Sequence, residues 1–297
     1  MTQREAVYII IPVYNRKATT LHCLSQLQQQ GDLDRFEVIV VDDGSTDGTA
    51  AAIQAHYPSV IVLPGNGNLW WTGAIAHGMQ YAYTHGAAFF VWLNDDTLPS
   101  PNAIASLVQA CKDNPQTITS AQCYATAELK EPTYGGKRKA GLKHLLIAVA
   151  PPESAICDSL HGNVVCIPRA VVDRIGYPPT HQVPHYHGDS VYTWKAKQAG
   201  YQLTVLGWAT AVCAKNPGDP SWLLSDFPIW KRWQSFLSPK SPFYIPGFWR
   251  FCLAFWGPVG TLVFVQPYIR LAVIWALRIL FPRPVLHQLK AQRSVEG

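Results

Sequence analysis

Residues 36–45 read FEVIVVDDGS, a run of strand-forming apolar residues that ends in two adjacent carboxylates. The segment 36–41 shows the nearly continuous apolar pattern of a strand buried on both faces of a parallel sheet. Asp42 and Asp43 follow at the point where this strand ends, and ligands of α/β sheets bind beyond the carboxyl ends of the strands. The segment therefore predicts an α/β fold with a polar site at one sheet edge.

The same arrangement occurs on both sides of this segment. Residues 6–11 (AVYIII) precede Asn15-Arg16, and residues 88–93 (AFFVWL) precede Asn94-Asp95-Asp96. Strands alternating with helices predict βαβ units and a mostly parallel, Rossmann-like sheet flanked by helices. The helices expected between and after these strands cover residues 18–30, 46–56, 72–85 and 101–112, and a further strand is expected at 60–63.

The second half of the chain is less regular at first. Strands are expected at 162–168 and 201–206, and helices at 169–175 and 189–199. Residues 124–160 show no clear period, and residues 135–139 (GGKRK) are expected to form a solvated basic loop.

Composition excludes several classes of protein. The 297 residues are 48% hydrophobic and only 14% charged, which argues against disorder. Seven scattered cysteines without a C-x-x-C pair argue against a disulfide framework or a structural zinc site, and favour a reducing compartment. The N-terminus lacks the features of a signal peptide. The net charge of +5 is too modest to suggest nucleic acid as a partner.

The charge is distributed unevenly, which suggests two parts. Residues 1–226 contain 15 Lys+Arg and 18 Asp+Glu, whereas residues 227–297 contain nine Lys+Arg, one acid and 15 of the 35 aromatic residues. We therefore expect a body at 1–226 and a basic, aromatic, helical tail at 227–297.

The tail has the character of a membrane-associated segment. Residues 251–269 carry no charge, but Gly257-Pro258, Gly260 and Pro267 are expected to interrupt a crossing helix. In 268–281, Arg270 and Arg278 share one face of an apolar helix, which favours a helix lying in the lipid headgroups. A broken or re-entrant hairpin and a buried oligomer interface are the alternatives.

Asn94-Asp95-Asp96 is the strongest chemical signal. Adjacent carboxylates at the end of an apolar strand repel each other unless a cation lies between them and a ligand, and Mg²⁺ or Mn²⁺ with diphosphate oxygens fits this need. The alternative is a solvated turn before Pro99.

For Asp42-Asp43 the alternatives are hydrogen bonds to a nucleotide, or charges that favour a helix capped by Ser45 or Thr46. Neither phosphate-binding glycine motif, G-x-x-x-x-G-K-[ST] or G-x-G-x-x-G after the first strand, is present.

The chain resembles a known family at this point. The segments IIIPVYNR, VIVVDDGSTDGT, GNGNLWWTGAIAHG, WLNDDT and GNVVCIPRAVVDRIG occur in this order and are similar to family 2 glycosyltransferases of the GT-A fold. These are inverting enzymes that use nucleotide-diphospho sugars. The resemblance covers about residues 6–215, and it implies a nucleotide-sugar-binding half at 1–123 and an acceptor-side half at 124–226.

The resemblance also implies roles for individual residues. Along the nucleotide it places Pro12, Tyr14, Asn15 and Arg16. Asp42 would contact the base, Asp43 and Gly44 would lie close to the ribose, and Asn68 and Gly73 would lie beside the donor. Asn94-Asp95-Asp96 would be the D-x-D-type motif, with Asn94 in place of the first acid and Asp96 as the metal ligand.

Inversion requires a base on the acceptor side, and the resemblance implies Asp189 for this role. The family's usual Glu-Asp pair is here Gly188-Asp189. The alternative for Asp189 is an N-cap of the following helix. Trp70, Trp71 and His187 are expected on the acceptor side, whereas Trp92, inside a strand, is expected in the core.

The sequence thus predicts an inverting, Mg²⁺- or Mn²⁺-dependent glycosyltransferase. Its donor would be a UDP- or dTDP-sugar, and its acceptor a glycan or lipid-linked glycan of polysaccharide or cell-envelope synthesis. The tail would hold it at the cytoplasmic face of the membrane as a peripheral or re-entrant protein. A non-catalytic sugar-nucleotide-binding scaffold and a nucleotidyltransferase are the alternatives.

Overall fold

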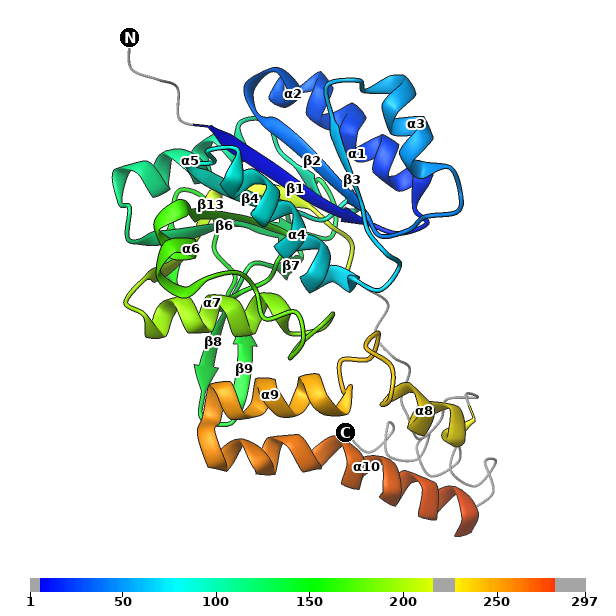
Figure 1. Cartoon of the computed structure of the whole chain (residues 1–297). Coiled ribbons are helices and arrows are strands. Elements are labelled where there is room, and N and C mark those ends of the chain that lie inside the picture. Colours follow the sequence, from blue (N-terminus) through cyan, green and yellow to red (C-terminus); the bar gives the residue numbers. More distant parts are fainter. Residues whose placement is uncertain (1–5, 216–227, 281–297) are drawn as a thin grey trace. The chain divides into compact units, whose positions relative to one another are not determined.

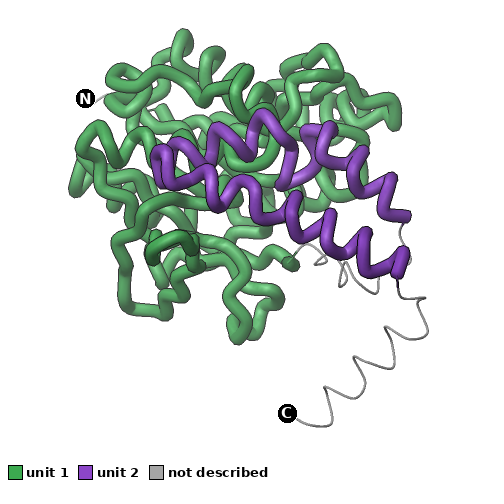
Figure 2. Tube along the Cα trace, turned by 90° about the horizontal axis from the view of Figure 1, so that it is seen from below, with its two compact units in different colours: residues 1–215 green, residues 216–297 purple. Residues whose placement is uncertain are grey.

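The computed structural model describes residues 6–215 and 228–280. The chain divides into two compact units, residues 1–215 and 216–297, coloured separately in Figure 2 and described here one at a time. The boundary expected between residues 226 and 227 falls at the edge of 216–227, outside the described residues.

The first unit is a mixed α/β domain (Figure 1). Its strands are β1 (Val7–Val13), β2 (Glu37–Asp42), β3 (Ile61–Pro64), β4 (Phe89–Leu93), β5 (Leu98–Pro99), β6 (Thr117–Tyr124), β7 (Pro132–Tyr134), β8 (Gly136–Ala140), β9 (Lys143–Leu146), β10 (Ser154–Ile156), β11 (Ser159–Leu160), β12 (Val164–Pro168) and β13 (Gln202–Val212). Its helices are α1 (Lys17–Gln29), α2 (Asp32–Arg35), α3 (Thr49–His56), α4 (Trp70–Thr84), α5 (Ala103–Asp113), α6 (Arg169–Ile175) and α7 (Gly188–Gln198).

The main sheet has the strand order β10-β13-β6-β12-β4-β1-β2-β3, with β5 and β7 paired at its side. β3, β2, β1 and β4 are parallel, and β13 is parallel to β6. β12 is antiparallel to both of its neighbours. The expected mostly parallel sheet is thus confirmed, and the carboxyl ends of β1, β2 and β4 lie at one edge.

The alternation of β1 explains how the sheet is covered on both faces. Ile9 and Ile11 belong to a core that α1, α3 and α5 close, whereas Tyr8 and Ile10 belong to a second core closed by α4, α6 and α7. Because successive strand residues point to opposite faces, a strand with both faces buried must be apolar throughout. Trp92 of β4 is completely buried in the second core, as expected.

The structure differs from expectation in the least regular part of the sequence. β6 was not predicted, because TITSAQCY has no apolar run, yet every residue of it is buried. Two of its polar side chains find partners in other strands: Ser120 donates to the Val164 carbonyl of β12 and Gln122 to the Tyr134 carbonyl of β7. The first strand, expected at 6–11, continues through Pro12, which lies inside β1 opposite Val41.

The prediction of a solvated basic loop at 135–139 is also wrong. Gly136–Ala140 forms β8, the middle strand of a separate three-stranded sheet with the order β11-β8-β9. The alternation of the strand turns Lys137 and Lys139 inward and leaves Arg138 exposed, and the Lys139 ammonium lies 5.8 Å from the centre of the Trp194 ring. Pairing and packing therefore replace the solvation that the sequence suggested.

The second unit contains α8 (Ile229–Ser235), α9 (Ile245–Trp256), a 3₁₀ turn at Gly257–Val259 and α10 (Gly260–Leu280). The chain folds back at Gly257, and Gly260 approaches α9 so closely that a Cβ there would stand 2.2 Å from the Cys252 carbonyl oxygen. The interruption expected at Gly257-Pro258 is therefore confirmed. The interruption expected at Pro267 is wrong, because α10 continues through it.

Candidate functional site

The loops that follow β1 and β2 are joined by short hydrogen bonds. The Asn15 N–H donates to Ser45 Oγ at 2.8 Å, and the Thr46 N–H donates to Asn15 Oδ1 at 2.7 Å. Asn15 has a positive φ of 51°, a conformation that Asn tolerates better than most residues. The residues expected along the nucleotide, Pro12 to Arg16, are thus held at the sheet edge, with Tyr14 exposed.

Both carboxylates at the end of β2 are buried and bound by backbone N–H groups. Asp42 Oδ1 accepts from Ser45 at 2.9 Å. Asp43 accepts from the Gly67 N–H at 2.8 Å and from the Trp70 N–H at 2.9 Å. Asp43 therefore shapes the loop that precedes α4, and Gly44 permits its close approach, since a Cβ there would stand 3.2 Å from Gly67 Cα. On this loop lies Asn68, which is exposed, and Gly73 is buried in the first turn of α4.

The acidic turn after β4 is occupied by an arginine. Arg16 Nε lies 3.3 Å from Asp95 Oδ2, and Arg16 Nη2 lies 3.0 Å from Asp96 Oδ2. The Asp95 carboxylate is almost fully buried and also accepts from the Thr20 hydroxyl at 3.1 Å. Burial raises the pKa of Asp95 to about 6, against the opposing effect of Arg16. The Asp96 side chain is 36% exposed, so it is the more accessible of the two acids.

The donor set of this turn fits a hard divalent cation. Mg²⁺ and Mn²⁺ bind carboxylate oxygens, and Mg²⁺ commonly takes one or two carboxylates and completes its shell with water and substrate phosphates. Asp96 offers an accessible carboxylate next to a second, buried one, and in the described part of the chain their one ion-pair partner is the half-exposed side chain of Arg16. Within residues 6–215 and 228–280, no group of three or more His, Cys, Asp or Glu side chains is arranged as a complete protein metal site. A cation here would thus depend on the phosphates of a ligand.

Trp71 connects this turn to Gly162 and to the start of α7. Its indole N–H donates to Asn94 Oδ1 at 2.8 Å. The other end of the ring lies against Gly162, where a Cβ would stand 2.3 Å from the indole and 3.3 Å from the Asp189 Cβ. Only glycine fits at 162, and its absent side chain lets Trp71 lie between Asn94 and Asp189.

Asp189 is the second residue of α7, and the N-cap position belongs to His187, which has a positive φ of 70°. The alternative prediction, that Asp189 is the N-cap of this helix, is therefore wrong. Asp189 Oδ2 accepts from the Gly162 N–H at 2.8 Å, and Oδ1 accepts from the Ser190 N–H at 2.6 Å. Backbone donors thus orient a half-buried carboxylate beside Trp71.

Gly188 has a steric explanation. A Cβ at this position would stand 2.0 Å from the hydroxyl oxygen of Thr72, which is buried at the start of α4. The Thr72 N–H also donates to the Pro184 carbonyl at 3.0 Å, so the loop before α7 lies directly on α4. Trp70 and His185 meet edge to face across the same contact, with ring centres 5.9 Å apart.

Several residues near the site were not predicted from the sequence. Thr20 holds Asp95, and Cys213, at the end of β13, makes a weak sulfur contact of 3.9 Å with Asp96 Oδ1. Asn163 donates to the Cys213 sulfur at 3.4 Å. Asn163 belongs to the segment GNVVCIPRAVVDRIG but had no role assigned, and Thr20 and Cys213 stand in none of the quoted segments. Thr20 reaches the acidic turn from α1, whereas the pairing of β12 and β13 with distant strands brings Asn163 and Cys213 to it.

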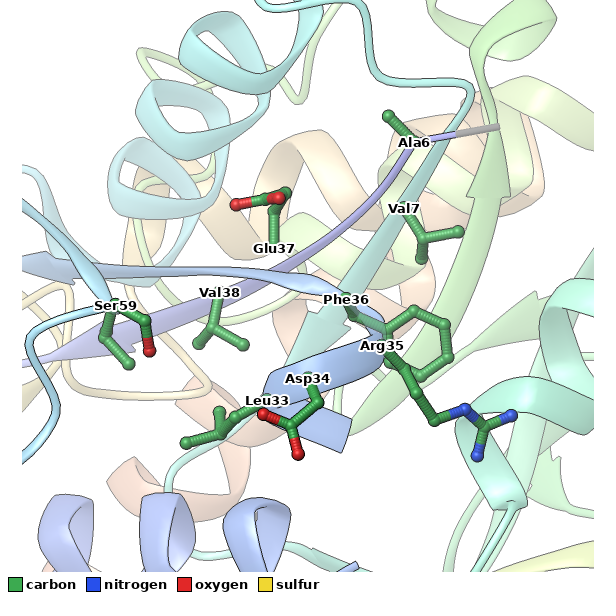
Figure 3. Close-up of a pocket in the computed structure, with 10 residues that line it drawn as sticks. Ala6, Val7, Leu33, Asp34, Arg35, Phe36, Glu37, Val38 and Ser59 are labelled. Carbon is green, nitrogen blue, oxygen red and sulfur yellow. The ribbon is translucent and has the colours of Figure 1, made fainter. Parts of the chain in front are cut away.

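A pocket of about 300 Å³ lies elsewhere on the first unit (Figure 3). Figure 3 shows Val7, Glu37 and Arg35 around it, and Val7 and Glu37 are the first residues of β1 and β2. It is therefore at the amino ends of the parallel strands, opposite the edge that carries the residues described above. Because ligands of such sheets bind at the carboxyl ends, we assign the candidate site to that edge.

Comparisons with known proteins identify the family of the chain. The family model for glycosyl transferase family 2 matches residues 8–157. YfnE of Bacillus subtilis, described as an uncharacterized glycosyltransferase, is 31% identical over 106 residues, which are 34% of this chain and 26% of that protein. An uncharacterized glycosyltransferase of Haemophilus influenzae is 31% identical over 107 residues, 36% of this chain and 35% of that protein. The matches thus span 26% and 35% of these relatives' lengths.

Two solved structures share the fold. The mannosyltransferase PcManGT from Pyrobaculum calidifontis, in complex with GDP-Man and Mn²⁺, matches with a TM-score of 0.57 and 20% identity, over 99% of this chain and 81% of that one. GalNAc-T7 with UDP, GalNAc and Mn²⁺ matches with a TM-score of 0.58 and 13% identity, over 75% of this chain and 47% of that one. The first unit has the expected GT-A fold, and the chain belongs to glycosyl transferase family 2.

Proposed function

We propose that this protein is an inverting glycosyltransferase that moves a sugar from a nucleotide-diphospho sugar to a glycan or lipid-linked glycan. The observation that carries the proposal is the contact of Trp71 with Asn94 on one side and with Gly162, beside Asp189, on the other. It brings the acidic turn and a carboxylate oriented by backbone N–H groups to one site. A donor whose diphosphate faces Asp96 would present its sugar toward Trp71 and Asp189.

In the proposed reaction, the acceptor hydroxyl oxygen attacks the anomeric carbon on the face opposite the diphosphate. The new carbon–oxygen bond forms while the bond to the diphosphate breaks, and the diphosphate keeps the electron pair. Asp189 takes the proton of the attacking hydroxyl as general base. The Gly162 and Ser190 N–H groups hold the carboxylate in place for this transfer.

We propose that Asp96 holds a Mg²⁺ or Mn²⁺ ion, with Asn94 and Asp95 beside the diphosphate. When bound, the cation would neutralise the charge of the leaving diphosphate. Arg16 then has a second role besides contact with the nucleotide, because its guanidinium balances the two carboxylates when no other cation is near. The Mn²⁺ named with PcManGT and GalNAc-T7 supports a divalent cation in this fold.

The donor nucleotide is proposed as UDP or dTDP, with GDP included in any test because PcManGT is named with GDP-Man. The remaining donor contacts are proposed as the sequence predicts them: Asp42 at the base, Asp43 and Gly44 near the ribose, and Asn68 and Gly73 beside the sugar-diphosphate. Trp70, Trp71 and His187 are proposed on the acceptor side.

We further propose that the second unit holds the protein at the cytoplasmic membrane face, within polysaccharide or cell-envelope synthesis. The run Ile245–Leu280 is long and apolar enough to cross a membrane by length and composition. It is folded back at Gly257, and α10 alone, with 21 residues, would be roughly 31 Å long, close to the hydrocarbon thickness of a bilayer. Leu262, Ile269, Val273 and Leu280 are all more than half exposed and lie along one stripe of α10.

The proposal is tested by transfer assays with a panel of UDP-, dTDP- and GDP-sugars. Inversion predicts that the product has the opposite anomeric configuration to the donor, which proton NMR reads from the anomeric coupling. Asp189→Asn should lower turnover by about 10²–10⁴-fold while donor affinity stays near normal. If donor affinity collapses instead, Asp189 is structural or a donor ligand. Donor binding without any hydrolysis or transfer would favour the non-catalytic scaffold.

A further inference from the structure

The small sheet β11-β8-β9 brings a lysine toward the acceptor side. Lys137 of β8 lies opposite Ser159 of β11, and Gly136 lies opposite Leu160. The strand leads into Gly162, whose N–H donates to Asp189, and the Leu160 N–H donates to the Thr193 hydroxyl of α7 at 3.1 Å. β11 therefore connects Lys137 to the helix that carries Asp189.

The Asp189 carboxylate acts on the charge of Lys137. Burial lowers the pKa of Lys137, and the Asp189 carboxylate opposes this effect. The two groups are thus near enough to interact, yet within residues 6–215 and 228–280 no ion pair or hydrogen bond is formed by the Lys137 ammonium. The Asp189 carboxylate instead accepts from the Gly162 and Ser190 N–H groups, so the lysine ammonium has a carboxylate nearby but no directly bound counter-ion among the described residues.

The neighbouring groups do not compensate that charge either. His144 shares a hydrogen bond of 2.9 Å with the Ser159 hydroxyl, and His161 shares one of 3.1 Å with the Gly135 carbonyl. Burial is the main cause that lowers the pKa of His144 to about 4, and the positive charge of Lys137 adds to it. The same two causes hold the pKa of His161 well below its usual value. Both rings are neutral at pH 7 and carry no negative charge.

The carboxylate of Asp158, whose N–H donates to the Lys137 carbonyl across the strand pair, is already engaged. Asp158 pairs with the Lys197 ammonium and accepts from the Lys139 N–H at 2.5 Å. Lys137 is therefore a half-buried cation among neutral rings and backbone, with Asp189 as the acid that acts on it. A cation in such surroundings attracts an anion more strongly than one on an open surface, because solvent screens it less.

We propose that Lys137 forms a subsite for an anionic group of the acceptor, a phosphate or a carboxylate, next to the hydroxyl that Asp189 deprotonates. The proposal rests on the proposed function, in which Asp189 faces the acceptor. The anion would compensate the lysine charge and place the acceptor relative to the base. An acceptor phosphate would come from a lipid-linked or phosphorylated glycan, whereas a carboxylate would come from an acidic sugar.

A protection experiment tests the subsite without requiring turnover. The full-length protein is acetylated briefly with acetic anhydride in the presence of phenyl phosphate, phenyl β-glucuronide or neutral phenyl β-glucoside, and each lysine is quantified by peptide mass spectrometry. We expect at least one of the two anionic probes to slow acetylation of Lys137 several-fold, with the exposed Lys143 unaffected. The effective probe distinguishes phosphate from carboxylate recognition.

Two results of this experiment would overturn the subsite. One is equal protection by the neutral glucoside, or equal protection of Lys143. The other is protection by UDP alone that the anionic probes cannot match, since this would place Lys137 on the donor side.

A kinetic experiment separates this inference from the proposed function. Lys137→Met should raise KM for an acceptor that carries the recognised anion by about 10–100-fold, the range expected for losing a charged hydrogen bond, and leave donor hydrolysis unchanged. Arg138→Met is the matched control, because Arg138 lies on the exposed face of the same strand and donates to the Ile156 carbonyl. Equal KM effects of both variants, or none for Lys137→Met, would contradict the subsite. Absence of both hydrolysis and transfer in the unmodified protein would contradict the proposed function instead.

Discussion

The indole N–H of Trp71 donates a 2.8 Å hydrogen bond to Asn94 Oδ1, so the first residue of the acidic turn is held by a side chain in the first turn of α4. An aspartate at position 94 could accept the same bond, but it would add a third negative charge beside Asp95 and Asp96. Asn94 thus keeps the hydrogen bond and limits the repulsion that Arg16 must balance.

Trp71→Phe tests this relationship. The smaller ring should largely retain the packing against Trp92, whose ring centre lies 5.5 Å away, but it loses the donor to Asn94. Leaving a partly buried amide oxygen without its donor costs about 1–3 kcal/mol, so we expect turnover to fall by about 10-fold or more. Circular dichroism serves as the control for folding. Unchanged kinetics in Trp71→Phe would show that the bond to Asn94 does not organise the site.

Gly188→Ala tests the close approach of α7 to α4. The new Cβ would stand 2.0 Å from the Thr72 hydroxyl oxygen, so we expect a loss of about 1–3 kcal/mol in the free energy of unfolding, as overpacking usually costs. Thr72→Ala removes that oxygen, and the double variant should therefore lose less than the two single variants together. Strict additivity in denaturant unfolding would argue against the predicted collision.

The residues at the ends of β2 and β4 could be predicted from the sequence, whereas the need for glycine at 188 could not. Apolar strands that end in polar clusters place Asp42, Asp43 and Asn94–Asp96 at one edge, because this inference needs only local pattern and the geometry of parallel strands. The absence of a side chain at 188 has no local cause, since the reason lies in Thr72, more than a hundred positions away. β6 was missed for a similar reason: its buried Ser120 and Gln122 find their hydrogen-bond partners in distant strands.

Charge at the site was equally hard to predict. Arg16 and Lys137 appear in the sequence as one residue of a motif and one residue of a basic run. The carboxylates that lie near them are identified only when β1 is placed beside β4, and when β11 is placed between β8 and α7. The sequence predicts a solvated loop at 135–139 because Lys137, Arg138 and Lys139 are all cationic. Three consecutive charges show no alternation of apolar and polar residues, which is the pattern that indicates a strand.

The pKa of His144 makes the stability of the first unit depend on pH. Burial and Lys137 lower this pKa to about 4, while Asp158 opposes the shift and His187 adds to it. As pH falls from about 6.5, the unfolded chain takes up a proton that folded His144 refuses, so stability is lost between about pH 6.5 and about pH 4. His144→Gln should remove about 1–2 kcal/mol of this loss after allowance for solvent screening, leaving the contribution of His161. Urea unfolding at pH 7 and pH 4.5 measures it; an unchanged pH dependence in His144→Gln would contradict the assignment.

The exposed stripe of α10 should control membrane binding. Ile269→Asp and Val273→Asp place a charge among exposed apolar side chains, and we expect each to reduce partition into anionic vesicles by at least about 10-fold because burying a carboxylate in lipid is costly. Gln54→Asp, at an exposed position of the first unit, is the matched control. Flotation with vesicles measures the bound fraction. Equal binding by all variants would show that α10 does not contact lipid through this stripe.

Calorimetric titration of UDP-, dTDP- and GDP-sugars into the full-length protein tests the proposed donor site at the acidic turn most directly. Each titration is made with Mn²⁺ and with EDTA, for the unmodified chain and for Asp96→Asn. We predict that at least one donor binds in a metal-dependent manner, that Asp96→Asn abolishes the difference between Mn²⁺ and EDTA, and that the exposed Asp113→Asn control retains it. Donor binding that is equally tight in EDTA, or a metal effect that survives in Asp96→Asn, would contradict a donor site built on the acidic turn.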